Sequence, residues 1–348
     1  WDRLFLEAER AASLPPDDPS RLLWKRRLIR MLFGQDERIR DIAERYVDLG
    51  DLLAIQQREI GTGPIGGKAA GMLLARAILA ADSAFDWNTC LERHDSFFVG
   101  SDVYYTYLVH NDCFRLRLRQ NTEEGYFALA DELRGKLEHG VFPTTLRDRF
   151  IAMLEYFGNS PLIVRSSSLL EDQFGNAFAG KYESVFCPGQ GSPETRYRQF
   201  EEAVRQVYAS TMNPDALAYR HKRGLAGRDE QMALLVQRVS GDRHGSLFFP
   251  YVAGMGNSSN LYVWDRDIDG SAGMTRLVFG LGTRAVDRVA GDYPRIVALD
   301  RPSLVPVAGR DRARFSQHEV DVLDLEANAL RSLPVRDVLR KSPEIDTG

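Results

Sequence analysis

The sequence has few cysteines, no long apolar run and no strong excess of either charge. Its three cysteines lie far apart and form no CxxC pair, so we expect neither a disulfide framework nor a zinc site, and a reducing, cytoplasmic compartment. No apolar run approaches the roughly 18–20 residues that a membrane-spanning helix needs, and no signal peptide opens the chain. The 45 basic and 49 acidic residues are mixed along the chain, which argues against nucleic acid or a membrane surface as a partner.

The rest of the composition is that of an ordinary globular protein. Hydrophobic residues make up 44% and charged residues 27% of the 348 positions, and this length is enough for two or three compact units with cores of their own. Because the first residue is Trp1 and not Met, we expect the sequence to be a piece of a longer polypeptide.

The pattern of apolar residues divides the chain into four spans. Residues 1–58 carry apolar side chains at helical spacing and predict a helical extension. Residues 59–235 and 236–310 mix helices with short strand-like runs in irregular order, which predicts two α+β lobes. Residues 311–348 are charged and predict a helical segment leading toward a following domain. The expected strands are residues 97–99, 162–164, 233–236, 246–249, 261–264 and 276–279, and the clearest helices are residues 69–79 and 194–209.

A glycine-rich loop, GTGPIGGK, occupies residues 61–68 and runs into a helical pattern. Its GxGxxG spacing does not indicate a dinucleotide site, because residues 51–60 are polar and give no buried strand before it. A Walker A loop also fails, since Thr62 takes the first glycine position and Ala69 replaces the metal-binding hydroxyl. Two interpretations remain: a phosphate site at a helix start around Lys68, or a tight loop with a solvated lysine.

The segment PLIVRSSSLLED, residues 161–172, is more informative. A buried strand delivers Arg165 and three serine hydroxyls, and two carboxylates follow. A guanidinium suits bidentate contacts to phosphate, hydroxyls such as that of Ser166 can donate to phosphate oxygens, and the carboxylates can orient the arginine. The alternative is a capped helix start with a surface ion pair.

These segments together resemble the nucleotide-binding region of the phosphoenolpyruvate synthase and pyruvate phosphate dikinase family. The resemblance rests on several motifs in the family's order, from about residue 60 to residue 300. They are GGKA at 66–69, VRSS with ED at 164–172, FAGK at 178–181, VQRV at 236–239, GLG at 280–282 and, loosely, GDY at 291–293. Rifampicin phosphotransferases and α-glucan water dikinases share this region.

The resemblance implies a two-lobed ATP-grasp module that binds ATP and Mg²⁺. In that family, a phosphoryl group passes from ATP to a histidine on a swivelling domain, which then visits a pyruvate-binding barrel. By resemblance, Lys68 and Arg165 hold the phosphates and serve catalysis, with Ser166 beside them. Gln237 and Val239 lie on the hinge strand against adenine, and Arg295 is a further phosphate contact.

Two departures from the family pattern bear on activity. Thr283 follows the Gly-Leu-Gly turn, where the family has a glutamate near the magnesium ion, and residues 248–252, FFPYV, replace a polar run that ends in Asn-Pro. Asp287 or Asp292 is the carboxylate expected to compensate as a metal ligand. None of the six histidines has the flanks of the family's acceptor histidine, so we expect the acceptor and the barrel in other parts of the parent protein. Two alternatives stay open: a nucleotide-sensing domain without catalysis, and a structural or interaction domain.

Overall fold

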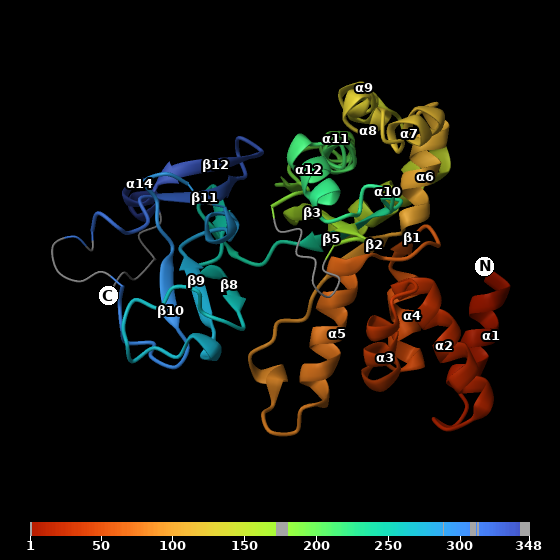
Figure 1. Cartoon of the computed structure of the whole chain (residues 1–348), viewed down its shortest axis with the longest axis horizontal. Coiled ribbons are helices and arrows are strands. Elements are labelled where there is room, and N and C mark those ends of the chain that lie inside the picture. Colours follow the sequence, from red (N-terminus) through yellow and green to blue (C-terminus); the bar gives the residue numbers. More distant parts are fainter. Residues whose placement is uncertain (1, 172–179, 288, 307–310, 312, 342–348) are drawn as a thin grey trace. The chain divides into compact units, whose positions relative to one another are not determined.

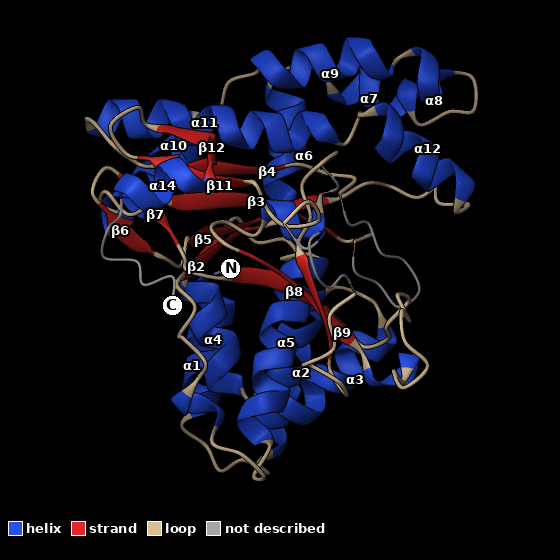
Figure 2. Ribbon diagram, turned by 90° about the vertical axis from the view of Figure 1, so that its left-hand side faces the viewer, coloured by secondary structure: helices blue, strands red, loops and turns tan. Residues whose placement is uncertain are grey.

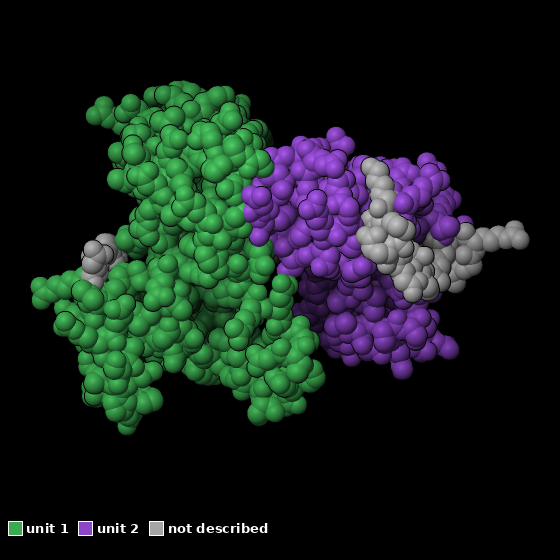
Figure 3. Space-filling model, turned by 180° about the vertical axis from the view of Figure 1, so that it is seen from behind, with its two compact units in different colours: residues 1–158, 162–186, 191–238 green, residues 159–161, 187–190, 239–348 purple. Residues whose placement is uncertain are grey.

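The computed structural model describes residues 2–171, 180–287, 289–306, 311 and 313–341. The chain divides into two compact units, which Figure 3 colours separately. Unit 1 contains Trp1–Gly158, Leu162–Phe186 and Gly191–Arg238, and unit 2 contains Asn159–Pro161, Cys187–Gln190 and Val239–Gly348. The last boundary between the two units falls after Arg238. The sequence pattern places the boundary between the two lobes nearby, at residues 235–236.

Unit 1 begins with four helices. They are α1 (Asp2–Ala12), α2 (Pro19–Phe33), α3 (Glu37–Tyr46) and α4 (Leu49–Gln57), as labelled in Figure 1. The last three have aspartate N-caps, Asp18, Asp36 and Asp48, whose carboxylates accept hydrogen bonds from the first backbone N–H groups. Buried side chains of all four helices form one hydrophobic cluster with residues of the next helix and of the sheet. The N-terminal helices therefore share a core with the sheet of unit 1.

The centre of unit 1 is a five-stranded mixed sheet with the order β1-β2-β5-β3-β4. Its strands are β1 (Glu59–Ile60), β2 (Ser96–Val99), β3 (Leu162–Ser168), β4 (Ser184–Cys187) and β5 (Met232–Arg238). Strands β1 and β2 are parallel, whereas β5 runs antiparallel to both of its neighbours, β2 and β3. The first five residues of β5 are all buried, as its unbroken apolar run predicts for a central strand.

Helices cover both faces of this sheet. Figure 2 shows α4 and α5 (Gly67–Ala81) on one side of the strands and α10 (Thr144–Phe157) and α11 (Pro193–Ser210) on the other. Helix α5 packs on β3 and β5, while α11 packs on β3 and α9. The remaining helices of unit 1 are η1 (Trp87–Thr89), α6 (Ser101–His110), α7 (Phe114–Gln120), α8 (Gly125–Ala128), α9 (Ala130–His139) and α12 (Pro214–Lys222).

Unit 2 contains two antiparallel sheets. The four-stranded sheet has the order β12-β11-β7-β6, and the three-stranded sheet has the order β10-β9-β8. The strands are β6 (Asp242–His244), β7 (Leu247–Phe249), β8 (Ala253–Asn257), β9 (Met274–Val278), β10 (Arg295–Ala298), β11 (Glu319–Asp324) and β12 (Ala329–Pro334); the helices are η2 (Gly270–Ala272), α13 (Thr283–Val286) and α14 (Val335–Lys341). Buried residues of β7, β11 and α14 form its core cluster.

Most of the expected elements are confirmed, and two are wrong. Strands β2, β3, β5, β7 and β9 and helices α5 and α11 form where the sequence predicts them. Residues 261–264 form no strand, because Leu261 is 88% exposed and no strand of the described part of the chain pairs with the segment. The helix expected over residues 311–348 is also wrong: the β11–β12 hairpin occupies most of the described part, and only α14 is helical. In β11, Val320 and Val322 are fully buried, and this burial favours the strand. Among the described residues, no helix is both long and apolar enough to cross a membrane.

Candidate functional site

The glycine-rich loop is fastened to the end of β3. A Cβ atom on Gly66 would lie 1.4 Å from the carbonyl oxygen of Ser167, and one on Gly67 would lie 1.9 Å from that of Glu171. Only glycine permits such an approach, and Gly66 also has a φ of +82°. The hydroxyl of Ser167 donates to the carbonyl oxygen of Ile65 at 2.8 Å and accepts from the N–H of Ala69 at 3.1 Å. The loop and the first turn of α5 are thus held against β3.

Lys68, in the first turn of α5, pairs with a buried carboxylate. Its ammonium donates to Oε1 of Glu171 at 2.5 Å and to Oγ of Ser166 at 3.0 Å. The side chain of Lys68 is only 20% exposed and that of Glu171 is 0% exposed, so the solvated-lysine interpretation is wrong. Burial raises the pKa of Glu171, and the nearby Lys68 ammonium opposes this rise. An ammonium has three N–H donors, so one remains for a ligand.

Arg165 and Gln237 meet on the neighbouring strands β3 and β5. Nη1 of Arg165 donates to Oε1 of Gln237 at 3.3 Å, and Nε2 of Gln237 lies 3.2 Å from Oγ of Ser96. The antiparallel register opposes Gln237 to Ile163, so the arginine and the glutamine are diagonal neighbours across the strand pair. Glu171 pairs with Lys68, whereas the sequence interpretation had it orienting Arg165. Asp172 and the start of the FAGK motif lie outside the described residues.

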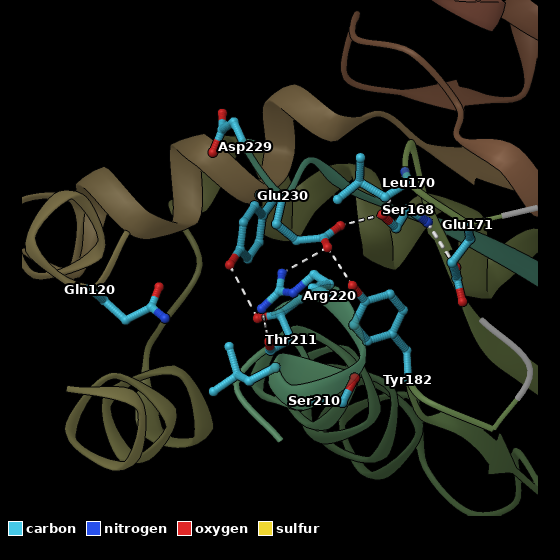
Figure 4. Close-up of polar contacts among 12 residues, drawn as sticks. Gln120, Ser168, Leu170, Glu171, Tyr182, Ser210, Thr211, Arg220, Asp229 and Glu230 are labelled. Carbon is cyan, nitrogen blue, oxygen red and sulfur yellow. Dashed lines mark hydrogen bonds and ion pairs between the residues drawn. The ribbon is translucent and has the colours of Figure 1, made fainter. Parts of the chain in front are cut away.

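A buried polar network supports the end of β3, and no local sequence pattern predicts it. Glu230 accepts hydrogen bonds from Ser168, Tyr182 and Arg220, and Nη1 of Arg220 lies 2.8 Å from its carboxylate (Figure 4). Nη2 of Arg220 also donates to the carbonyl oxygen of Thr211 at 2.7 Å. The side chains of Arg220 and Glu230 are 2% and 0% exposed. This ion pair ties α12 to the last residue of β3, next to the segment that carries Glu171.

The other predicted residues lie in unit 2. Arg295 begins β10 and is exposed, Asp287 follows α13 and is exposed, and the N–H of Val239 donates to the carbonyl oxygen of Pro161 at 2.9 Å. Asp292 is half-buried, and its Oδ2 accepts from Arg284 at 2.6 Å.

Arg284 occupies the centre of an acidic cluster around Thr283. Its guanidinium donates to Asp292, to Glu319 at 2.9 Å and to Asp321 at 3.0 Å, and its side chain is 7% exposed. The hydroxyl of Thr283 donates to Oδ2 of Asp321 at 2.5 Å. Sequence reasoning missed Asp321, because it lies 38 residues from Thr283 and only the fold brings them together.

These carboxylates do not fit a magnesium site built on Asp287 and Asp292. Oδ2 of Asp292 accepts from Arg284 and its Oδ1 accepts from the N–H of His318, so both oxygens already have donors. Mg²⁺ needs unprotonated oxygen ligands in a near-octahedral arrangement, whereas a guanidinium fills the space here. Over the described ranges, no group of three or more His, Cys, Asp or Glu side chains is placed to hold a metal ion.

The site and the fold define a class of protein. A lysine at a helix start, a glycine loop packed on a strand and an arginine on that strand are typical of α+β domains that bind phosphate-bearing ligands. The family model described as "Pyruvate phosphate dikinase, AMP/ATP-binding domain" matches residues 63–337. The chain belongs to this family, and the α+β class with N-terminal helices is confirmed.

A curated relative supports the same family. Phosphoenolpyruvate synthase of Pseudomonas aeruginosa (strain UCBPP-PA14) is 25% identical to the chain over 228 residues, which cover 57% of this chain. The match spans 28% of the relative's own length. Helices α1–α4 and strand β1 lie before residue 63, outside the span that the family model matches.

Proposed function

We propose that this ATP-binding module of the family donates a phosphoryl group from ATP to a histidine on a separate domain of the parent protein. The observation that carries the proposal is the Lys68–Glu171 pair. It holds an ammonium in the first turn of a helix, with one N–H donor left for a phosphate oxygen. Family membership supports ATP as the ligand.

In this proposal, the two cations of unit 1 bind the phosphates. Lys68 offers a point charge, and Arg165 offers a planar guanidinium, a group whose shape suits bidentate contacts to phosphate. The hydroxyl of Ser166 accepts from the Lys68 ammonium at 3.0 Å and donates to Oε1 of Glu171 at 3.1 Å, so in this proposal Ser166 holds the pair beside the phosphates. The ammonium and the guanidinium are both positively charged, and this charge attracts the negative phosphate groups.

The other predicted contacts concern adenine and the second lobe. Gln237 and Val239 flank the end of β5, where the hinge strand is proposed to face adenine, and Arg295 is proposed as a further phosphate contact. Positioning and charge neutralisation dominate phosphoryl transfer, and these residues supply both. No step of the proposal passes through a metal ion, because both oxygens of Asp292 already accept hydrogen bonds, from Arg284 and from the N–H of His318.

The partners follow from the family and remain part of the proposal. The proposed phosphoryl acceptor is a histidine on a swivelling domain, and a pyruvate-binding barrel is proposed to complete the reaction, as the resemblance to the family implies. None of the six histidines of this chain has the flanks of the acceptor motif. The cytoplasm is the proposed compartment, on the grounds of the three dispersed cysteines.

Isothermal titration calorimetry with ATP tests the binding half of the proposal. Lys68→Ala and Arg165→Ala should each weaken binding about ten- to a hundredfold, the effect of losing one charge-assisted contact of about 1.5–3 kcal/mol. Lys222→Ala, which removes an exposed lysine of α12, is the matched control and should bind like the wild type. Unchanged affinity in both site variants, with the fold intact, would contradict the assignment.

One observation favours a second candidate, a nucleotide-sensing domain without catalysis. Arg284 and Thr283 hold the acidic cluster of unit 2 in a form that leaves no room for Mg²⁺. Both candidates predict ATP binding and differ in transfer. Labelled ATP incubated with the chain and the histidine domain of the parent protein should give acid-labile phosphohistidine on that domain. ATP binding without any such product would favour the sensor.

A further inference from the structure

Unit 1 contains a cavity of about 600 Å³ that borders the site at one residue, Ser96, whose Oγ lies 3.2 Å from Nε2 of Gln237. Its walls are the end of α3, helix α4, the outer half of α5, residues 87–94 and strand β2. The volume falls within the range of small-molecule sites in proteins, about 300–1,000 Å³. Lys68, Arg165 and Gln237 are not among its lining residues.

One wall of the cavity comes from outside the part of the chain that the family shares. Lining residues between Tyr46 and Arg58 precede residue 63, where the family match begins. The opposite wall is one face of α5, with Leu73, Arg76 and Ala77, three positions that helical spacing places together. The cavity therefore exists because the N-terminal helices pack beside α5.

Among the described residues, one cation of the cavity lining, Arg76, has no counter-ion. The guanidinium of Arg76 makes no ion pair or side-chain hydrogen bond within the described part of the chain. Arg58, on the same lining, is neutralised by Asp95 at 2.7 Å. The carboxylate of Asp51 accepts from the N–H of Asp48 at 2.9 Å in the capping box of α4. Arg76 is thus the group that attracts a charged ligand.

The rest of the lining suits a flat apolar body. Trp87, Leu73 and Phe98 contribute aromatic and aliphatic surface. His94 adds a polar edge, and partial burial lowers the pKa of its ring, as do the nearby Arg76 and Arg58. Its Nδ1 lies 3.1 Å from Oγ of Ser96.

We propose that this cavity is a second ligand site, which binds an organic anion with an aromatic or similarly flat apolar body. Arg76 binds the acidic group of the ligand, a sulfonate, carboxylate or phosphate, and Trp87 and Leu73 contact its body. The inference does not depend on the proposed function, because the cavity and the ATP contacts use different residues.

A fluorescence titration of the whole chain with 8-anilinonaphthalene-1-sulfonate, an aromatic sulfonate, tests the proposal. Arg76→Gln removes the charge and should weaken binding about tenfold or more, as expected for one charge-assisted contact. Ala77→Phe fills the cavity and should abolish the saturable signal. The matched controls are Arg45→Gln on the exposed side of α3 and Ala75→Phe on the exposed side of α5, which should bind like the wild type.

A competition experiment with ATP distinguishes binding in this cavity from binding at the nucleotide site. Saturating ATP should leave the probe bound in the wild type, and Arg76→Gln should bind ATP with unchanged affinity. Displacement of the probe by ATP would overturn the proposal, as would equal probe affinity in Arg76→Gln, Ala77→Phe and the wild type. Because Arg76 is only half-buried and lacks described partners, Arg76→Gln keeps the test decisive even if Ala77→Phe fails to fold.

Discussion

The ammonium of Lys68 lies 2.5 Å from a carboxylate oxygen of Glu171, which has no exposed side-chain surface. A pair of this kind positions the cation well but contributes little net stability, because removing both charges from water offsets most of their attraction. Removing only one of the two charges is strongly destabilising, because the other charge then stays buried without a partner. The pair therefore predicts an asymmetric set of mutational effects.

Lys68→Met should lower the free energy of unfolding by about 3 kcal/mol, since it leaves Glu171 buried without its partner. The double variant Lys68→Met/Glu171→Met should recover much of that loss, because apolar groups of similar volume replace the whole pair. Urea unfolding of Lys68→Met, Glu171→Met and the double variant measures the coupling free energy between the two side chains. Glu138→Ala breaks the exposed pair with Arg134 and should change stability by less than about 1 kcal/mol. Simple additivity of the Lys68 and Glu171 effects would contradict this account.

The Arg220–Glu230 pair supports a second prediction. Arg220→Met should destabilise the chain by about 3–5 kcal/mol, because Glu230 stays buried with its charge uncompensated. Tyr182→Phe removes only one of the donors to Glu230 and should cost about 1 kcal/mol. Chemical denaturation of both variants gives the ranking. Equal losses would mean that the guanidinium is not the group that neutralises Glu230.

Sequence patterns were sufficient where the signal is local. The unbroken apolar run of residues 233–236 predicts a strand, and these residues lie in β5, the central strand of the sheet. The small residues after Lys68 predict a helix, and α5 begins at Gly67. The order of several short motifs predicted the family, which the match over residues 63–337 shows.

Long-range pairings could not be predicted in the same way. Glu171 follows Arg165 closely in sequence, so the arginine was its natural partner, yet it pairs with Lys68, 103 residues away. Charged residues over 311–348 predict a helix, but β11 pairs with β12 in a hairpin, and Val320 and Val322 are buried in the core cluster with residues of β7 and α14. Strand β1 has only two residues, too few to leave a pattern, although it directly precedes the glycine loop.

Glu59, which precedes that loop, predicts a dependence of stability on pH. Its side chain is buried, with Oε1 lacking a hydrogen bond among the described residues, and burial, helped by Asp102, raises its pKa to about 8. A carboxyl whose pKa is raised in the folded state stabilises the protein below its unfolded pKa, near 4.5. That contribution is lost as pH rises toward about 8.

Glu59→Gln never ionises, so the variant should gain stability relative to the wild type between pH 5 and pH 8.5, on the order of a few kcal/mol. Denaturant unfolding at several pH values measures the difference. Glu132→Gln, at an exposed position of α9, is the control and should track the wild type. A constant difference across this range would show that Glu59 does not titrate there.

Thr283 offers a test of why the acidic cluster of unit 2 does not fit a metal ion. Its hydroxyl donates to Asp321, so Thr283→Glu would replace a donor with a second carboxylate at the same place. Two adjacent carboxylates repel each other, and we expect the melting temperature of Thr283→Glu to fall in the absence of divalent ions. Millimolar Mg²⁺ should then raise its melting temperature more than that of the wild type, because hard oxygen ligands now bind the ion in the folded state. Thr283→Gln has nearly the same shape as Thr283→Glu without the charge and should show no extra response to Mg²⁺.

An equal response in the wild type and in Thr283→Glu would mean that Arg284 still excludes the ion. In that case, the variant Thr283→Glu/Arg284→Met should be the first to gain a response, because it frees Asp292, Glu319 and Asp321 from the guanidinium.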